Sequence, residues 1–414
     1  MRNIFRLAAL NLARYKRRTA LTALLITLGV TAVLLFIAVA GSFTAMMVGQ
    51  ITDSMLGHLQ IHRAGYVAAV ENLPLNRNLN AQQLAQVEQV LANDPAVASY
   101  SLRIKLGAMF SNFNETTNIR LNAVVPEKEA ATMPLLTSRI SEGNKAGLVG
   151  RGEILIPELL AKGMQVKVGD TIVLVATNKE GSVNGQPFVV RGVLSGISGP
   201  GGRDGVVHLD DAKTLLRIEG IEVSEIAVRL RNLKDVATAT KRLTAALAGH
   251  KNPQGQPVFE VHPWEKLTPF ATIARMIDLM TMFIRVMLIA IVLVSIMNVM
   301  IMAVYERINE IGTMAAIGTQ PGSIMALFVT EGFLLGLLGI ALGTAISVVA
   351  IIALRAAHIT FAFGMQSGIA LMPVLTPKDI VTVAVLVIII AVVASLQPAA
   401  KAAKMDPITA LRHV

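Results

Sequence analysis

The sequence predicts a membrane protein with four transmembrane α-helices and a large α+β extracytoplasmic domain between the first and second of them. The mean hydropathy of +0.60 and the 15% of charged residues make the 414-residue chain too apolar for a soluble protein of this size. The apolar residues gather near the two ends of the chain, and a long stretch of ordinary soluble composition lies between them. A soluble domain inserted between membrane helices explains both features.

Basic residues at both ends of the chain predict its orientation. Residues 1–18 hold six basic side chains and no acidic one, and residues 397–414 hold Lys401, Lys404 and Arg412 against Asp406. Cytoplasmic segments next to membrane helices carry such an excess of Lys and Arg. We therefore expect a multi-pass protein with both termini in the cytoplasm.

The first apolar run, Thr19–Thr52, contains no charged residue over 34 residues. As a helix it would be about 50 Å long, against about 30 Å for the hydrocarbon core of a bilayer. We expect the helix to continue beyond the membrane as a stalk. The alternative is a cleaved signal peptide with its cleavage site at 38–40, but the apolar run continues past that site.

Three further uncharged runs predict the remaining membrane helices, and each is about long enough to cross a bilayer. They are Val286–Tyr305, Gly332–Leu354 and Ile380–Leu396. Thr376 and Pro377 form a helix start before the last run, with Thr as the N-cap and Pro in the first turn. Four spans with both ends inside agree with the distribution of basic residues.

The segment from Asp53 to about Thr272 shows a mixed α and β pattern. We expect one subdomain at 53–125 with 224–264, and a second, inserted one at 126–223. The expected helices are Ala81–Ala92, Pro157–Gly163, an Asp210-capped helix to Arg217, and Lys234–Gly249. The expected strands are Val97–Phe110, Thr116–Val125, Thr171–Ala176, Pro187–Leu194 after a turn at Lys179–Gly185, Val206–Leu209, Ser224–Leu230 and Pro257–Val261.

These elements give a predicted order along the chain. It is a cytoplasmic basic amphipathic helix at 1–18, helix 1 and stalk at 19–52, the outer domain at 53–272, stalk and helix 2 at 273–305, a cytoplasmic helix at 306–322, helix 3 at 323–355, an outer loop at 356–378, helix 4 at 379–397 and a cytoplasmic tail at 398–414.

The segment Tyr305–Pro321 predicts a short amphipathic helix at the membrane surface between spans two and three. Apolar residues recur on one face within the tolerance of a helical stripe, and Gly318 followed by Pro321 predicts the helix end. The residues of interest are Glu306, Arg307, Ile308, Glu310, Ile311, Met314, Ile317 and Gly318.

Small and polar residues inside the spans are further candidates. Glycines at spacings of three and four form a stripe on the third span where helix backbones approach closely: Gly332, Gly336, Gly339 and Gly343. Arg285 and Glu331 lie near span ends, where charged side chains either reach the interface or form an ion pair. Asp278 is a candidate partner for Arg285, and the basic N-terminus, for instance Arg14 or Arg17, for Glu331. Asn298 lies mid-span, where an amide hydrogen-bonds across helices.

Several kinds of chemistry find no support. The phosphate-binding pattern GxxxxGK[ST] does not occur, and the glycine-rich stretch 199–205 lacks its Lys-Ser pair. His58 and His62 are four residues apart, but the Glu of a metallopeptidase helix and a third ligand are missing, so we expect a strand and no metal. There is no cysteine, and the positive charge marks topology rather than nucleic-acid binding.

The chain resembles the MacB/FtsX/LolC-LolE permeases, the mechanotransmission class of ABC transporters. The outline of one span, a large outer domain and three further spans is similar, and so are three stretches in the membrane parts: ALNLARYKRRTALTALLITLGV, Glu306–Gly343 and Gln397–Arg412. GHLQIHRAGY, Gly57–Tyr66, is most similar to the lipoprotein-releasing branch. The resemblance implies a MacB-like periplasmic domain and a bacterial inner-membrane location.

The resemblance also implies a function. A separate ABC ATPase subunit, which binds ATP and Mg²⁺, would dock on the helix at 306–318, so this chain is expected to be a permease with no cofactor and no enzyme activity of its own. Further implied partners are a second permease chain, identical or related, a periplasmic substrate or carrier protein, and membrane lipid, but no nucleic acid. Lipoprotein release is favoured, and the alternatives are MacB-like export of drugs or peptides and FtsX-like regulation of a cell-wall hydrolase.

Overall fold

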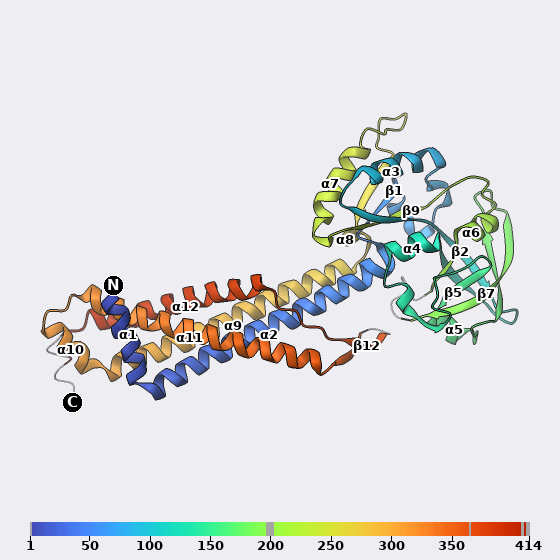
Figure 1. Ribbon diagram of the computed structural model, residues 1–414. Coiled ribbons are helices and arrows are strands. Elements are labelled where there is room, and N and C mark those ends of the chain that lie inside the picture. The colour runs from blue at the N-terminus through green and yellow to red at the C-terminus, as the bar shows by residue number, and fades with distance from the viewer. Residues whose placement is uncertain (1, 196–202, 364–365, 407–409, 411–414) are drawn as a thin grey trace. The chain divides into compact units, whose positions relative to one another are not determined.

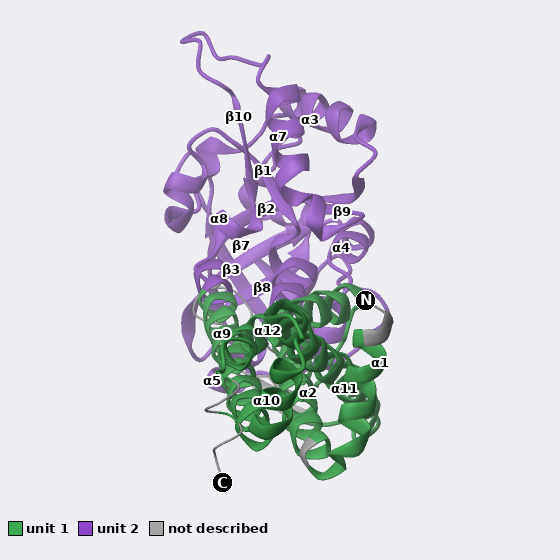
Figure 2. Cartoon of the chain, turned by 90° about the vertical axis from the view of Figure 1, so that its left-hand side faces the viewer, with its two compact units in different colours: residues 1–45, 276–361, 370–414 green, residues 46–275, 362–369 purple. Residues whose placement is uncertain are grey.

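The computed structural model describes residues 2–195, 203–363, 366–406 and 410, which form two compact units (Figures 1 and 2). Unit 1 consists of residues 1–45, 276–361 and 370–414, and unit 2 of residues 46–275 and 362–369. Unit 2 contains the predicted outer domain. Part of the glycine-rich stretch, 199–202, lies outside the described residues.

Unit 1 is built of helices, and the described residues include four that are long and apolar enough to cross a membrane. This confirms the predicted number of spans. Their side chains share one apolar core, with Ile26, Ile296 and Phe328 among its buried members. The helices are α1 (Arg2–Arg14), α2 (Lys16–Ile51), α9 (Phe270–Glu306), α10 (Ile308–Ala316), α11 (Pro321–Ala356) and α12 (Pro377–Ala403).

The start of α12 follows the predicted cap. The Thr376 hydroxyl accepts a hydrogen bond from the Asp379 backbone, and the Asp379 side chain accepts one from the Thr376 backbone, which forms a capping box. The helix runs through Pro398 to Ala403, beyond the predicted end. The expected outer loop contains two short strands, β11 (Thr360–Phe363) and β12 (Gln366–Ala370), which are too short to show a strand periodicity in the sequence.

Six strands of unit 2 form a closed ring, because β6 pairs with both β2 and β7. Inward-facing apolar side chains fill it, among them Leu106 and Phe110 of β2 and Phe188 of β7. Around the ring the order is β2 (Val97–Ser111), β3 (Thr116–Val124), β8 (Asp204–His208), β5 (Glu153–Pro157), β7 (Val183–Leu194) and β6 (Thr171–Thr177). β4 (Ile140–Gly143) pairs with β7 outside the ring.

A wing of three more strands extends the sheet from β2. These strands are β9 (Glu225–Leu230), β1 (Leu59–Arg63) and β10 (Phe259–Pro263), and they pair antiparallel in that order. The wing lies beside two helices in Figure 1, α3 (Ala81–Asn93) and α7 (Val236–Leu247). The shorter helices are α4 (Pro126–Thr132), α5 (Glu158–Gly163), α6 (Leu209–Leu216) and α8 (Trp264–Leu267), and η1 (Thr52–Leu56) is a π-helix directly after α2.

The expected helices and strands of the outer domain are confirmed, with three corrections. The turn before β7 is shorter than predicted, since β7 already begins at Val183. The N-cap of α6 is His208, whose Nδ1 accepts the Asp210 N–H at 3.2 Å, rather than Asp210. The predicted boundary at 125/126 cuts through a shared core, because β2 and β3 close the ring with strands of the inserted segment.

A buried charge network lies where the wing meets the ring. The Arg103 guanidinium donates to Glu129 at 2.6 Å and to Glu225 at 3.0 Å, and Lys105 Nζ lies 2.8 Å from Glu225. His62, on β1 as predicted, has its Nε2 3.6 Å from Glu225. Both carboxylates are buried, and each is paired with the Arg103 guanidinium.

Acidification is expected to destabilise unit 2 in two steps. Burial lowers the pKa of His62 below 6.5 despite Glu225, so below pH 6.5 the unfolded chain takes up a proton that the folded chain does not. Stability then falls by up to about 1.4 kcal/mol per pH unit. Burial opposes ionisation of Glu225, but Lys105, His62 and Arg103 together lower its pKa below 4.5, so its stabilisation is lost below that pH.

The single tryptophan, Trp264, is buried in unit 2, and its fluorescence reports unfolding of this unit in the full chain. We expect His62→Leu to flatten the dependence between pH 5 and 6.5 while the step below pH 4.5 remains. His250→Gln, a change of another histidine in the same unit, is the control and should keep both steps. If the free energy of unfolding of His62→Leu falls as steeply between pH 6.5 and 5 as that of the wild type, His62 is not the group responsible for the first step.

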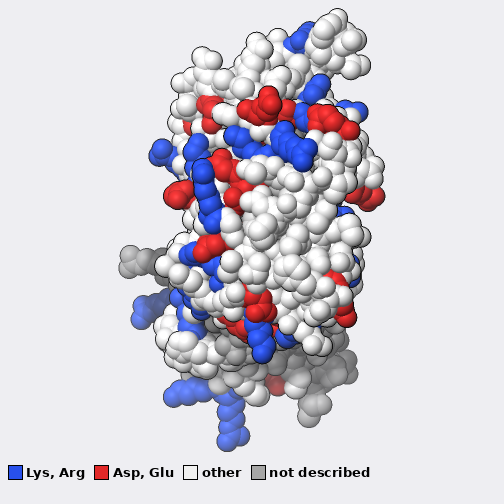
Figure 3. Space-filling model, turned by 90° about the vertical axis from the view of Figure 1, so that its right-hand side faces the viewer, with Lys and Arg blue, Asp and Glu red and all other residues white. Residues whose placement is uncertain are grey.

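Charged side chains of both signs are interspersed on the face shown in Figure 3. They do not gather there into a basic stripe of the kind that binds a nucleic-acid backbone.

Candidate functional site

The helix predicted between spans two and three is separated from α9 by a single residue. Arg307 has φ −113° and ψ 24°, outside the helical region, so α9 ends at Glu306 and α10 begins at Ile308. At its other end the Thr319 N–H donates to the Met314 carbonyl at 3.0 Å, and Gly318 has φ +89°. This left-handed glycine closes the helix as predicted.

The side chain of Arg307 turns inward and holds two carboxylates. Its Nη1 donates to both oxygens of Glu331 on α11, at 2.9 and 3.2 Å, and its Nε donates to Glu310 on α10 at 2.8 Å. Only 4% of Arg307 and 1% of Glu331 is exposed. Hydrogen bonds between ionised groups are roughly twice as strong as neutral ones, so the start of α10 is fixed to α11.

Helix α1 and the residue that follows it, Tyr15, reach the same two carboxylates. Asn11 Nδ2 donates to Glu331 at 2.8 Å, and the Tyr15 hydroxyl donates to Glu310 at 2.8 Å. The Arg307 guanidinium carbon lies 5.6 Å from the centre of the Tyr15 ring. We call these five residues, Asn11, Tyr15, Arg307, Glu310 and Glu331, the charge cluster; it joins α1 and the α1–α2 junction to α10 and α11.

The cluster corrects one predicted pairing. Glu331 does meet the N-terminal segment, but through Asn11, and its ion-pair partner is Arg307 rather than Arg14 or Arg17. Arg14 lies instead 4.0 Å from Glu310. Asn11 and Tyr15 were not predicted as site residues; their signal is the spacing of four. Tyr15 lies one turn after Asn11, in the residue that joins α1 to α2, and its N–H donates to the Asn11 carbonyl at 3.2 Å.

Protonation states follow from these contacts. Partial burial opposes ionisation of Glu310, but hydrogen bonds from Arg307 and Tyr15 outweigh it and lower its pKa. The hydrogen bond to Glu310 and partial burial raise the pKa of Tyr15. At neutral pH the pair is therefore a neutral hydroxyl that donates to a carboxylate.

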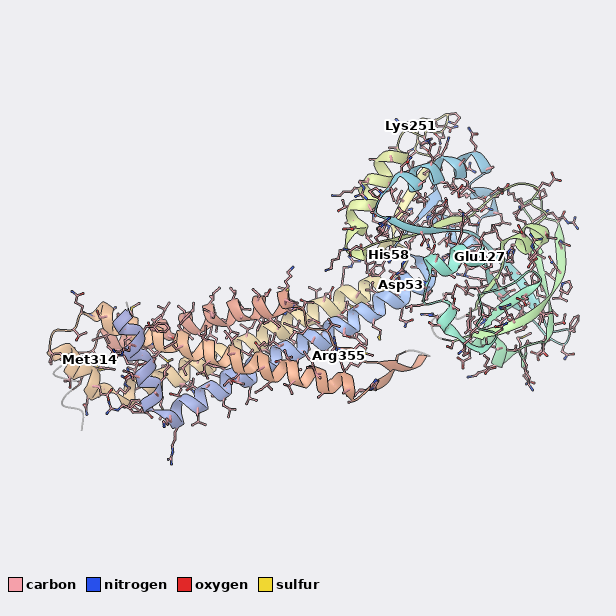
Figure 4. The ribbon with its side chains drawn as sticks, in the orientation of Figure 1. Asp53, His58, Glu127, Lys251, Met314 and Arg355 are labelled. Atoms are coloured by element: carbon pink, nitrogen blue, oxygen red, sulfur yellow. The ribbon has the colours of Figure 1, made fainter. Side chains whose placement is uncertain are left out.

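The apolar stripe of α10 faces the bundle along three of its four predicted residues. Ile311 is 1% exposed, and Ile308 and Met314, the latter labelled in Figure 4, are half-buried. Ile317 departs from the stripe: it is 78% exposed, because the helix ends at Ala316. Tyr305, at 59% exposed, is a second uncovered apolar side chain beside α10. The docking role of residues 306–318 stays a prediction. Because Arg307 is buried, its side chain lies on the bundle side of this segment and not on the exposed side.

All four stripe glycines lie at close helix contacts. A Cβ at Gly332 would stand within 2.9 Å of the Ser395 Cβ, and one at Gly336 would stand 2.8 Å from the Ala391 Cβ, both on α12. On α2, a Cβ at Gly339 or Gly343 would come within 2.7 Å of Ile26 or Val30. The stripe therefore divides into a half that contacts α12 and a half that contacts α2.

The other predicted polar residues of the spans lie apart from the cluster. Arg285 is half-buried and lines a small cavity with Asp379 of α12, whereas Asp278, its predicted partner, is exposed. Asn298 is exposed on α9, where it lines a groove with Arg17 and Glu306. Among the described residues, neither Arg285 nor Asn298 forms a hydrogen bond with a member of the charge cluster.

Family models match both parts of the chain. Residues 19–246 match the MacB-like periplasmic core domain, and residues 282–407 match the FtsX-like permease C-terminal domain. The chain belongs to the MacB/FtsX-like permease family. Unit 2 of the permease is therefore a MacB-like periplasmic domain, and α10 and α11 belong to the FtsX-like part.

Relatives of the permease come from different branches. It is 23% identical over 94% of its length to the lipoprotein-releasing system transmembrane protein LolC of Xylella fastidiosa, of which it covers 92%. It is 25% identical over 95% of its length to the pyoverdine export ATP-binding/permease protein PvdT of Pseudomonas putida, of which it covers 57%. Among solved structures, the periplasmic region of MacB from Actinobacillus actinomycetemcomitans matches with 12% identity and a TM-score of 0.35, over 50% of the permease and 89% of that chain.

Proposed function

We propose that the permease transmits the movement of a separate ABC ATPase subunit through α10 to its periplasmic domain, and so releases lipoproteins from the bacterial inner membrane. The observation that carries this proposal is the charge cluster. Arg307 ties α10 to Glu331 of α11, Asn11 ties α1 to Glu331, and Tyr15 ties the junction of α1 and α2 to Glu310. A surface helix attached to neighbouring helices by a buried ion pair and part-buried hydrogen bonds moves them when it is displaced.

The proposed arrangement places α10, α1 and the C-terminal end of α12 in the cytoplasm. Two permease chains, identical or related, and two ATPases would form the working unit. ATP and Mg²⁺ would bind to the ATPases, which would contact the exposed side of α10 and the exposed residues that flank it, Glu306 and Ile317. The periplasmic domain would meet the substrate and a carrier protein that accepts it.

The lipoprotein branch is favoured because the LolC proteins of two bacteria, Xylella fastidiosa and Neisseria meningitidis, match the permease over nearly their whole length. Export of a small molecule or peptide is the second candidate, and the match to the pyoverdine exporter PvdT favours it. Both candidates require the same coupling through α10, and they differ in what the periplasmic domain binds.

Glu310→Lys tests the coupling. The substitution removes the acceptor of Tyr15 and places a third cation beside Arg307 and Arg14, so we expect at least a tenfold loss of ATPase stimulation by the purified permease. The measurement is copurification of the ATPase from the native membrane, followed by its ATPase rate with and without the permease. Glu127→Lys, in the periplasmic domain, is the charge-matched control. Normal stimulation in Glu310→Lys, or no associated ATPase in the wild type, would overturn the proposal.

Reconstituted vesicles separate the two branches. Vesicles that carry the permease, its ATPase and a membrane-tethered lipoprotein should release the lipoprotein to a soluble periplasmic carrier only when ATP is supplied. If the ATPase is stimulated but no lipoprotein leaves the vesicle, the export branch is favoured instead.

A further inference from the structure

The end of α2 within unit 2 has an uncommon geometry. The helix passes into the π-helix η1 at Thr52–Leu56, which Gly57 ends with φ +76°. A Cβ at Gly57 would stand 3.0 Å from the Val228 carbonyl, so the chain passes close to β9 here. π-helical turns are rare and leave carbonyl groups that need donors from elsewhere.

Three arginines from three separate elements bind this segment, and two of them supply donors to its carbonyl groups. Arg103, in the middle of β2, donates to the Met55 carbonyl at 2.7 Å. Arg139 donates to the Gln50 carbonyl at 3.2 Å and to the Gln50 side chain at 2.5 Å. We call Arg103, Arg139 and Arg229 the arginine collar.

The third member binds a side chain of η1. Arg229, on β9, donates to the Asp53 carboxylate at 2.6 Å, and His58 Nε2 lies 3.6 Å from the same oxygen. Figure 4 shows Asp53 and His58 near each other. Cations at the C-terminal end of a helix also interact favourably with its dipole.

Arg103 joins the end of α2 to both halves of the periplasmic domain. Strand β2 pairs with β9 of the wing up to Arg103 and with β3 of the ring from Arg103 onward. The same guanidinium that holds Met55 also binds Glu225 of the wing and Glu129 of α4. A buried ion network often stabilises a protein no more than apolar residues would. The role that we assign to Arg103 is therefore to hold Met55, the wing and α4 in fixed positions relative to one another.

We propose that the arginine collar is the attachment through which movement of α2 reaches the periplasmic domain. This inference rests on the proposed function. Because Gln50, Asp53 and Met55 are each held by a different element, displacement of this segment carries η4 (Thr137–Arg139), the wing and the middle of β2 along together. Without the collar, we expect the turn through Gly57, which links this segment covalently to β1, to absorb much of the movement of α2 before it reaches the wing and the ring.

The first test measures the attachment itself by hydrogen exchange of the full-length permease in lipid nanodiscs. The test variant is the double substitution Arg139→Met with Arg229→Gln, which spares the buried Arg103 network. We expect the backbone amides of residues 50–57 to exchange at least tenfold faster than in the wild type. Arg191→Gln, which removes a 2.6 Å ion pair with Glu153 in the ring, is the control and should leave these amides unchanged. Equal protection in the double variant would overturn the collar.

The second test measures transmission with the copurified ATPase, with and without ATP and vanadate. In the wild type we expect nucleotide-dependent exchange changes in α10 and in the periplasmic domain. In the double variant the change in α10 and the ATPase rate should remain within about twofold, while the change in the periplasmic domain is lost. If α10 does not respond in the wild type, the proposed function fails. If α10 responds and the periplasmic domain responds equally in both proteins, only the collar fails.

Covalent rescue excludes a merely structural effect. The chain contains no cysteine, so Gln50→Cys with Arg139→Cys introduces the only two thiols. This variant should be uncoupled when reduced and should regain the periplasmic response after bridging with a short bifunctional thiol reagent. Bridging that restores nothing would count against attachment at this point as the route of transmission.

Discussion

Replacing Arg307 with methionine is expected to destabilise unit 1 by about 3–5 kcal/mol, the usual cost of leaving a buried charge without its partner. Glu331 is 1% exposed and would lose both bonds from Nη1, and Glu310 would lose the bond from Nε. The same change should abolish coupling, because α10 would no longer be tied to α11.

The unfolding of unit 1 can be followed by a single introduced thiol. Ala399 is fully buried in the apolar core, and Ala399→Cys adds a small thiol to a chain that has none. Its reaction rate with a maleimide, measured against denaturant concentration, reports opening of the bundle. If Arg307→Met reacts as slowly as its parent at every concentration, the ion pair does not stabilise the bundle.

A second substitution separates stability from coupling. Arg307→Met together with Glu331→Met leaves no unpaired buried charge between α10 and α11, and such replacements are often neutral or stabilising. We expect the double variant to recover most of the lost stability but not the stimulation of the ATPase. Recovery of both would show that the pair stabilises the bundle without transmitting movement.

The spans were predictable because each depends on a property of its own segment. An uncharged run of sufficient length crosses a membrane whatever the rest of the chain does, and Thr376 with Asp379 caps a helix using neighbouring atoms alone. The end of α10 at Gly318 follows for the same reason, since a left-handed residue favours glycine.

The predicted boundary between helix 2 and the cytoplasmic helix, at 305/306, lies close to the observed break at Arg307. The contacts of Arg307 were not predictable from its neighbours, because its guanidinium binds Glu310 and also Glu331, 24 positions away. The partner of Glu331 on α1 is more distant still, and charge alone favoured Arg14 or Arg17 over the neutral Asn11.

The closed ring of unit 2 was hidden for a related reason. Alternation of polar and apolar residues predicts strands but not their partners. β2 was expected as one strand of one subdomain, but its 15 residues are enough to pair with β9 along one part and with β3 and β6 along another. The arginine collar depends on the same long-range pairing, since it draws on β2, η4 and β9.

Gly343→Ala is expected to destabilise unit 1 by about 1–3 kcal/mol, the usual cost of inserting a methyl group into a closely packed contact. The new Cβ would lie 2.7 Å from the Val30 Cβ and 3.0 Å from the Thr27 carbonyl, a backbone atom of α2. Rotation of a side chain removes neither contact, so α2 itself must move away from α11. The thiol at position 399 measures this loss as well.

Two further variants test whether close approach is the cause. At Gly41, on α2, a new Cβ would have no described heavy atom within 4 Å apart from its chain neighbours and the nearby backbone of its own helix, so Gly41→Ala should be neutral or slightly stabilising. At Gly336 the one contact of a new Cβ is the Ala391 Cβ, so Gly336→Ala should destabilise and the exchange of the two residues, with Ala391→Gly, should restore stability. If the double variant, Gly336→Ala with Ala391→Gly, is as unstable as Gly336→Ala alone, close approach of α11 and α12 is not the cause of the destabilisation.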